Sequence, residues 1–399
     1  MSYVVIGSNY GDEGKGLMTD YLVRKTGAKT VVRFNGGAQA GHTVVDPSGK
    51  RHVFGHIGAG TFANADTYLS ATFIVNTLVL SKELKQLGEQ ATISADSYCR
   101  CTTIFDMMIN AEIERSRGEG RHGSCGLGIH ETVLRSSTYP IRFGDLKTGS
   151  VNFVADKLAT IAKYYVPMRL AELGLVASGH LRELLSTTDF TAHAQQMMYG
   201  ATEIQVPRYA PARYGHVFEG AQGLALDEEL GHFPHVTHSR TGLPDAVVTA
   251  GQIGVSSLFP VYVTRAYVTR HGRGPLAGEG LPIVKTKTHP VDATNVRNEF
   301  QEAIRFAPLD VTAMNRLIKS DLRRVSESNM IGVHIERPVI ALTCMDQMDE
   351  EVSVMVGDRH EWMPASSLPR FIERATGYKV RFISTGPSSG DVQDMGSVI

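Results

Sequence analysis

The sequence predicts an α/β fold with a largely parallel central sheet and helices on both faces. Short runs of β-branched residues alternate with helix-like segments, and several of these runs end in glycine-rich turns. Strands that alternate with helices are typical of parallel sheets, whose ligands bind at the carboxyl ends of the strands. The glycine-rich turns fall at such positions, so we expect the functional site there.

The individual elements follow from the hydrophobic pattern in chain order. We expect strands at 3–6, 30–34, 217–218, 261–264, 339–343 and 380–383, because each is a short β-branched run. Apolar residues at helical spacing predict helices within 73–90 and 153–175. Helical patterns are denser over 101–215, which predicts a helix-rich subdomain within a single domain spanning 1–399.

The charge balance excludes some classes of partner. The formal net charge is −1 at pH 7, so electrostatics do not favour nucleic acid or an anionic membrane. The amino-terminal apolar run is too short for a signal peptide, and no stretch approaches the ~18 apolar residues of a membrane-spanning helix. Only four cysteines occur, so we expect a cytoplasmic protein, in the host cytoplasm if it is viral. Cys99 and Cys101 have no second cysteine pair to complete a zinc site.

The loop at 7–16 (GSNYGDEGKG) matches a phosphate-binding loop only in part. The standard loop reads GxxxxGK followed by Ser or Thr, whereas Asn9 replaces its first glycine and Gly16 follows Lys15. Small residues still let backbone N–H groups approach an anion, and Lys15 adds positive charge. Asp12 and Glu13 would repel a bare phosphate. Their presence in the loop is explained if one of them binds Mg²⁺ or removes a proton from a substrate. The alternative is a plain strand-to-helix turn whose acidic residues favour the helix start.

A second glycine-rich loop, RFNGGAQAGHTVV at 33–45, again follows a predicted strand. A lone histidine is usually structural, but His42 lies in a turn with little side-chain packing, where it can meet a ligand. Three further histidines, His232, His235 and His238, are spaced three apart. Pro234 interrupts any helix between them, which argues against a metal site.

Together these loops resemble those of the adenylosuccinate synthetase family. The family's GDEGKGK appears here as GDEGKG at 11–16, and its GGxNAGHT-like loop as GGAQAGHT at 36–43. Further segments follow in the family's order: FEGAQG at 218–223, FPHVTHS at 233–239, AYVTRHGRGP at 266–275, LTCMD at 342–346 and ISTGP at 383–387. They resemble FEGAQG, YPYVTSS, AYxTRVGxGP, TKxD and an IxxxGP tail. Ordered motifs over nearly the whole chain are too specific to arise by chance.

The resemblance implies a two-step ligase that transfers the γ-phosphoryl group of a nucleoside triphosphate to the 6-oxygen of a purine nucleotide. L-Aspartate nitrogen then displaces phosphate at C6. Asp12 corresponds to the base that removes the N1 proton and, with the Gly41 carbonyl, binds Mg²⁺. His42 corresponds to the acid that stabilises the oxygen and the transferring phosphoryl group, and Lys15 adds positive charge. Gln222 corresponds to a glutamine that contacts the base and the 6-phosphoryl group.

The resemblance also assigns residues to the acceptor phosphate. Thr237 matches a threonine that holds the 5′-phosphate, and Ser124 and Cys125 occupy the place of a Gly-Thr-Thr phosphate contact. Arg135 is the candidate for an arginine that reaches across a homodimer interface to the 5′-phosphate. The other nucleotide- or phosphate-binding residues that the motifs imply are Gly11, Glu13 (which orients the loop), Gly14, Gly16, Gln39, Gly41, Thr43, Asp346, Ser384, Gly386 and Pro387.

Three departures from the family concern substrate choice. The TKxD motif becomes Thr343-Cys344-Met345-Asp346, so Asp346 can accept hydrogen bonds from guanine but the lysine that packs on the base is missing. GTP selectivity is then in doubt, and ATP or dATP becomes plausible. Gln39 is one methylene longer than the family's asparagine, which changes the acceptor pocket.

The third departure lies in the aspartate loop, where an arginine-rich segment is replaced by DATNVRNEFQEAIRFAPLD at 292–310. Thr294 and Arg297 are the nearest matches for binding L-aspartate, with Arg305 as a second positive charge. A planar guanidinium suits a dicarboxylate.

These departures resemble a divergent phage branch that converts dGMP into a precursor of 2-aminoadenine DNA. Some of its members have serine where Asp12 stands, which points back towards IMP and adenylosuccinate. Guanine and hypoxanthine share the N1 proton and the 6-oxo group, so Asp12 does not decide between them. We favour dGMP, because an enzyme of AMP synthesis has less reason to lose the lysine and the arginine run.

Two rival classes are disfavoured by single residues. A kinase or amide ligase with a standard phosphate loop needs Ser or Thr where Gly16 stands. A non-catalytic nucleotide-binding regulator would be expected to lose Asp12, Lys15 or His42, and all three are present.

Overall fold

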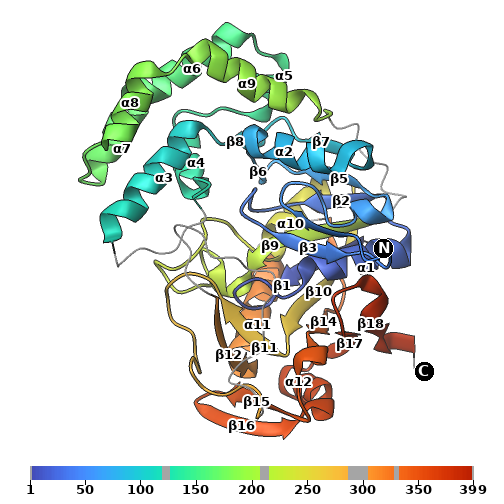
Figure 1. Cartoon of the computed structure of the whole chain (residues 1–399). Helices are drawn as coiled ribbons and strands as arrows, with labels where there is room; N and C mark the ends of the chain where they lie inside the picture. The colour runs from blue at the N-terminus through green and yellow to red at the C-terminus, as the bar shows by residue number, and fades with distance from the viewer. Residues whose placement is uncertain (1, 119–125, 207–214, 286–303, 328–331, 398–399) are drawn as a thin grey trace.

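The computed structural model describes residues 2–118, 126–206, 215–285, 304–327 and 332–397. A ten-stranded sheet crosses the molecule in the order β18-β17-β14-β10-β1-β9-β2-β5-β7, with β13 beside β10 (Figure 1). All its pairs are parallel except that of β18 with β17. Its strands are β1 (Ser2–Gly7), β2 (Thr30–Arg33), β5 (Asp66–Leu69), β7 (Ile93–Ala95), β9 (His216–Gly223), β10 (Ser257–Arg265), β13 (His334–Ile335), β14 (Val339–Thr343), β17 (Lys379–Ser384) and β18 (Val392–Asp394).

Helices cover both faces of this sheet, because its central strands are apolar on both sides. Along β1, Val4 and Ile6 belong to the same apolar cluster as α10, α11 and α12, whereas Tyr3 and Val5 pack with α1. Alternate residues of a strand point to opposite faces, so one strand serves both layers. The predicted fold class is confirmed, and all six predicted strands lie in this sheet. The covering helices are α1 (Lys15–Thr26), α10 (Leu243–Gln252), α11 (Val311–Glu327) and α12 (Leu368–Thr376).

A helical layer lies above the sheet in the view of Figure 1 and shares an apolar cluster with the edge strands β5 and β7. Its helices fall within the predicted range of 101–215. The helix predicted within 153–175 is present, but a π-helical turn at Ile161–Tyr165 divides it. The helices are α3 (Ile104–Arg117), α4 (Ile129–Ser136), α5 (Phe143–Thr148), α6 (Val151–Thr160), α7 (Val166–Glu172), α8 (Gly179–Thr187) and α9 (Phe190–Thr202).

Smaller sheets, which the sequence did not predict, complete the fold. A four-stranded sheet of β11 (Tyr267–Arg270), β12 (Arg305–Asp310), β15 (Glu351–Val356) and β16 (Arg359–Pro364) extends towards the end opposite the helical layer (Figure 1). The hairpin of β3 (His42–Val45) and β4 (Arg51–Phe54) carries His42. The short strand β6 (Ile74–Val75) pairs with β8 (Arg100–Cys101). Because β6 occupies the start of the range predicted as helix, α2 (Thr77–Leu87) begins at Thr77 and not at residue 73. In the part of the chain that the structure describes, no helix combines the length and apolarity needed to cross a bilayer.

Candidate active site

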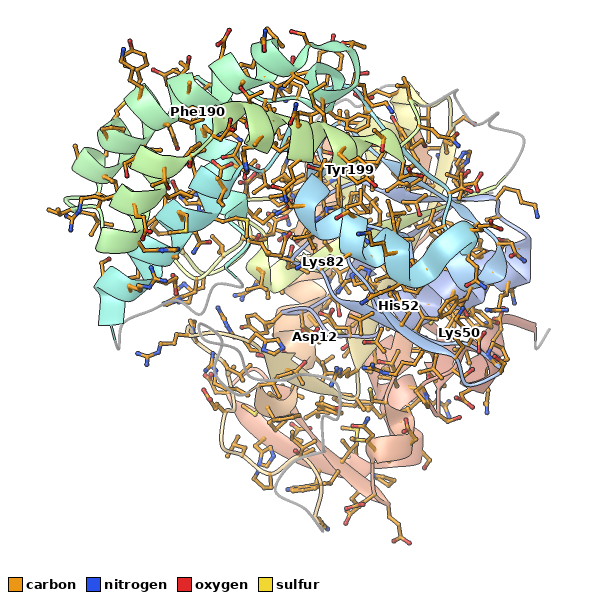
Figure 2. The ribbon with its side chains drawn as sticks, turned by 45° about the horizontal axis from the view of Figure 1, so that its top comes forward. Asp12, Lys50, His52, Lys82, Phe190 and Tyr199 are labelled. Carbon is orange, nitrogen blue, oxygen red and sulfur yellow. The ribbon has the colours of Figure 1, made fainter. Side chains whose placement is uncertain are left out.

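A cavity of about 1060 Å³ opens at the carboxyl ends of the central strands, between the helical layer and the four-stranded sheet. Asp12, which lines it, lies near the middle of the molecule in Figure 2. The loops after β1, β2, β9, β14 and β17 all contribute to its wall, as expected for a parallel sheet. The structure brings together these predicted residues: Gly11, Asp12, Gly14, Lys15, Gly16, Gln39, Gly41, His42, Thr43, Gln222, Thr237, Asp346, Ser384, Gly386 and Pro387.

Glu13 closes the first loop on itself. Its Oε1 accepts backbone N–H groups from Asn9 (2.9 Å) and Gly11 (3.0 Å), and its Oε2 pairs with Lys15 Nζ at 3.0 Å. A Cβ on Gly7 would lie 2.4 Å from that carboxylate, so the strand must end in glycine for the loop to fold back. These contacts match the orienting role predicted for Glu13, and they hold the Lys15 ammonium at the edge of the cavity.

Asp12 is held as a carboxylate by His271 and by the positive charge of nearby side chains. Its Oδ2 pairs with His271 Nε2 at 3.0 Å, and its backbone carbonyl accepts a hydrogen bond from Arg265 Nε. Burial alone would raise the pKa of Asp12, but His271, Arg265 and Lys15 outweigh it and lower that pKa below its usual value. Asp12 is therefore ionised at neutral pH and can accept a proton. Sequence reasoning missed His271, although it stands inside the TRHGRGP segment where the family pattern has valine.

His42 is oriented by a buried glutamate that sequence reasoning also missed. His42 Nδ1 lies 2.7 Å from Glu219 Oε1, which leaves Nε2 as the ring nitrogen available to a ligand. Glu219 is fully buried on β9, where it also accepts the Ala59 N–H (3.1 Å) and faces Arg33 at 3.7 Å. Burial lowers the pKa of His42 and Glu219 opposes that shift, so the free protein holds a neutral imidazole. The sequence does contain a clue to this role, because Glu219 is the only charged residue of the FEGAQG segment.

Two glutamine amides meet beside Gly36. A Cβ on Gly36 would lie 3.4 Å from Gln39 Nε2 and 3.6 Å from Gln222 Oε1. Both amide atoms of Gln39, and Oε1 of Gln222, are buried without a hydrogen-bond partner among the residues that the structure describes. Buried polar atoms normally find a partner, so this arrangement indicates a ligand whose polar edge satisfies them.

The loop after β14 forms another part of the wall. Thr343 Oγ1 donates to the Glu13 carbonyl (2.8 Å) and thereby ties this loop to the first one. Cys344 and Asp346 both line the cavity. Burial raises the pKa of the Cys344 thiol, so it stays neutral where the family pattern has a lysine.

Backbone strain is concentrated at this cavity. In the described ranges four non-glycine residues have a positive φ, and three of them line it: Asp12 (59°), Gln222 (56°) and Cys344 (60°). This conformation is unfavourable for residues other than glycine and often marks functional sites.

The structure contradicts the role predicted for Arg135, which was to reach a 5′-phosphate across a homodimer interface. The side chain is fully buried, and its guanidinium pairs with Asp106 through Nε (2.8 Å) and Nη2 (2.9 Å). It also donates to the carbonyls of Cys101 and Tyr139, each at 2.7 Å. Arg135 is thus a structural arginine that ties α4 to α3, and it does not reach out to the phosphate site of a partner subunit.

Arg305 also differs from its prediction. Its guanidinium donates to the carbonyls of Gly272 and Gly274 (2.8 Å each) and pairs with Glu279 at 2.7 Å, so it braces the loop that carries His271. It does not line the cavity described above. Four other predicted residues, Ser124, Cys125, Thr294 and Arg297, lie outside the described residues.

A parallel sheet with glycine-rich loops at its carboxyl edge, a lysine beside them and a paired carboxylate and histidine defines an enzyme that acts on a phosphorylated ligand. The adenylosuccinate synthetase family model matches residues 4–314. Adenylosuccinate synthetase of Shewanella amazonensis is 30% identical over 368 residues, which cover 89% of this chain and 79% of that protein. The enzyme of Psychrobacter cryohalolentis is 30% identical over 440 residues and covers 96% of each.

Two solved structures share the fold. The fully ligated adenylosuccinate synthetase of Plasmodium falciparum has a TM-score of 0.71 at 18% identity, covering 98% of this chain and 99% of that one. The cyanophage S-2L succinoaminodeoxyadenylate synthetase, bound to dGMP and to dATP as an energy donor, has a TM-score of 0.59 at 15% identity, covering 98% and 95%. The chain belongs to the adenylosuccinate synthetase family, whose members are carbon–nitrogen ligases of purine biosynthesis.

Proposed function

We propose that this chain joins L-aspartate to C6 of a 6-oxopurine nucleoside monophosphate through a 6-phosphoryl intermediate formed from a nucleoside triphosphate. One observation carries the proposal: Asp12 and His42, from two separate loops, line one cavity, and each is fixed by a charged partner. A carboxylate that takes a proton and an imidazole that stabilises charge on oxygen are what this reaction requires.

The two steps follow from these roles. Ionised Asp12 takes the N1 proton, and the purine O6 attacks the γ-phosphorus while the nucleoside diphosphate leaves. His42, oriented by Glu219 and protonated at Nε2 once the phosphates bind, stabilises negative charge on the transferring phosphoryl group together with Lys15. The neutral aspartate amine then attacks C6, the C6–O bond breaks and the departing phosphate takes up the proton that the amine loses, with Gln222 holding the base.

The donor set fits Mg²⁺. Asp12 offers a carboxylate and Gly41 a backbone carbonyl at the same cavity, and Mg²⁺ is commonly held by one or two carboxylates together with substrate phosphates. In the described residues no cluster of three metal-binding side chains occurs, so substrate oxygens would complete the coordination. When bound, the ion would neutralise charge on the phosphates.

We favour dGMP as the acceptor, giving N6-succino-2-amino-2′-deoxyadenylate. The unpartnered amides of Gln39 and Gln222 support this choice, because a 2-amino group adds a donor that such an edge can bind. The cyanophage enzyme that shares the fold is bound to dGMP. A phage or virus with such DNA would then express the protein in its host cytoplasm.

IMP is the second candidate, with adenylosuccinate as its product. Asp12 serves either base, since both carry the N1 proton. The curated relatives at 30% identity are named adenylosuccinate synthetases, which supports this alternative.

We propose ATP or dATP rather than GTP as the phosphoryl donor. The neutral thiol of Cys344 replaces a cationic stem that would pack on guanine, and only Asp346 remains of the guanine-reading pair. L-Aspartate would be bound by Thr294 and Arg297.

The test is a side-by-side assay of dGMP and IMP with ATP, dATP and GTP, measuring phosphate release with and without L-aspartate. We expect release that needs both acceptor and aspartate, with dGMP preferred. A strong preference for IMP would refute the favoured acceptor. Release without aspartate would favour a kinase or hydrolase, and no release at all would favour a non-catalytic regulator.

A further inference from the structure

Two histidines form a stacked pair in the cavity, outside the groups assigned to catalysis. The rings of His130 and His238 lie with their centroids 3.6 Å apart and their planes 30° from parallel. His130 belongs to the first turn of α4, whereas His238 follows Thr237 in the 233–239 segment, so two distant parts of the chain bring them together. Both rings line the cavity, as does Thr237. His238 stands where the family pattern YPYVTSS has serine.

In the described part of the chain, the two arginines whose charges act on His130 already have carboxylate partners. Arg169 makes two bonds with the buried Glu131, at 2.9 and 3.0 Å, and Arg117 pairs with Glu114 at 2.8 Å. Arg135, which might have supplied a further charge, is committed to Asp106. An incoming phosphate dianion therefore gains little uncompensated positive charge from these two arginines, whereas the two imidazoles can acquire positive charge by taking up a proton.

The histidine pair is neutral in the free protein. Burial lowers the pKa of His130 to about 3, and His238, Arg169 and Arg117 contribute to the shift. Burial and Arg169 also lower the pKa of His238. Among the described residues, Glu131 is the carboxylate paired with the rings, 3.8 Å from His130 Nε2, and Arg169 neutralises it. Because the rings are in contact, a second proton would be strongly opposed by the first, so the pair can hold at most one.

We infer that the stacked rings of His130 and His238 receive the 5′-phosphate of the acceptor nucleotide and take up a proton as it binds. The inference rests on the proposed function, since it assumes that a nucleoside monophosphate occupies the cavity.

The direction of the pH dependence follows from the charges. A phosphate dianion beside the rings favours their charged form and raises the pKa of the pair, so binding consumes a proton. Affinity for the monophosphate should therefore rise as the pH falls from 8 towards about 6, where phosphate monoesters begin to take their own second proton. A pair that is only structural would leave affinity and proton count unchanged.

The experiment is isothermal titration of the whole protein with dGMP and IMP, and with deoxyguanosine and inosine as phosphate-free controls, in two buffers of different ionisation heat. We expect proton uptake, up to one per nucleotide, with the monophosphates and none with the nucleosides. The variant with both His130→Asn and His238→Asn should lose this uptake and bind monophosphates about 10- to 100-fold more weakly. Its nucleoside binding should not change, which also verifies folding.

Two further variants sharpen the test. His238→Ser, which restores the residue of the family pattern, should lower the uptake, and His180→Asn, at an exposed position on α8, should leave it unchanged. Binding of monophosphates by the wild type without proton uptake, or retention of uptake in the double variant, would overturn the inference. A wild type that binds neither dGMP nor IMP would instead refute the proposed function itself.

Discussion

Replacing Glu219 by glutamine tests the most specific feature of the site, a buried carboxylate that orients His42 and raises its pKa. The change keeps the shape of the side chain and removes its charge. A hydrogen bond to a charged group contributes about 1.5–3 kcal/mol, so the imidazolium should lose about that much stabilisation. The pKa of His42 should then fall by about one to two units, and turnover by about 10- to 100-fold.

The pH profile of activity shows in which direction the substitution shifts the pKa of His42. Burial already holds the pKa of His42 below its usual value, and Glu219 works against that shift. If protonated His42 stabilises the transferring phosphoryl group, activity is lost as the pH rises through its pKa. In the variant that loss must occur at lower pH. The assay is aspartate-dependent phosphate release measured from pH 5.5 to 9.

The effect on stability must be measured separately from the effect on turnover, because Glu219→Gln also removes the carboxylate paired with the buried Arg33. Loss of one partner of a buried pair costs about 3–5 kcal/mol, so thermal unfolding should be measured beside activity. Glu83→Gln is the matched control: Glu83 is another buried acceptor, bonded to the N–H groups of Gly55 and His56, but it does not contact His42. An unchanged alkaline limb in Glu219→Gln, or an equal loss of turnover in Glu83→Gln, would refute the role assigned to Glu219.

Four other substitutions have definite expected outcomes. Asp12→Asn, which suits the positive φ at this position, should lower turnover by about 10²- to 10⁴-fold with little change in melting temperature, and substantial residual activity would exclude Asp12 as the base. Arg135→Ala should destabilise the protein by about 3–5 kcal/mol in denaturant titrations, because it strands the buried Asp106; a stable variant with weak nucleotide binding would instead restore the partner-reaching role. Gly16→Ser should lower kcat by about 10- to 100-fold, since its Cβ would lie 3.0 Å from both His42 Cβ and the Thr43 carbonyl oxygen, and a fully active variant would show that this contact is tolerated. Cys344→Lys should raise kcat/KM for GTP relative to ATP, and an unchanged ratio would mean that the base is selected elsewhere.

Local pattern was enough to predict six of the ten strands of the central sheet, because these six are short apolar runs that alternate with helices along the chain. The pattern did not predict β5, β7, β13 and β18, of which β13 and β18 are short and only partly buried. The four-stranded sheet escaped prediction because β16 carries Arg359, His360 and Glu361, which break the apolar pattern, and its pairing depends on contacts distant in sequence.

Site residues could be predicted where a sequence motif places them on a loop. They could not be predicted where their role depends on contacts with residues distant in the sequence. Asp12, His42 and Gln222 share a cavity as their loops suggested. Arg135 was misread, since its sequence neighbourhood gives no hint that Asp106, on another helix, takes its guanidinium. His271 was missed for the same reason, because only the fold places it against Asp12.

The left-handed backbone at Asp12, Gln222 and Cys344 has a consequence for protein engineering. Each costs about 1–2 kcal/mol relative to glycine in the same conformation. Laboratory selection for heat resistance alone would therefore tend to enrich glycine at these codons, gaining melting temperature while deleting the proton acceptor and the amide that holds the base. Libraries built on this scaffold should keep the three codons fixed and seek their gains in the helical layer.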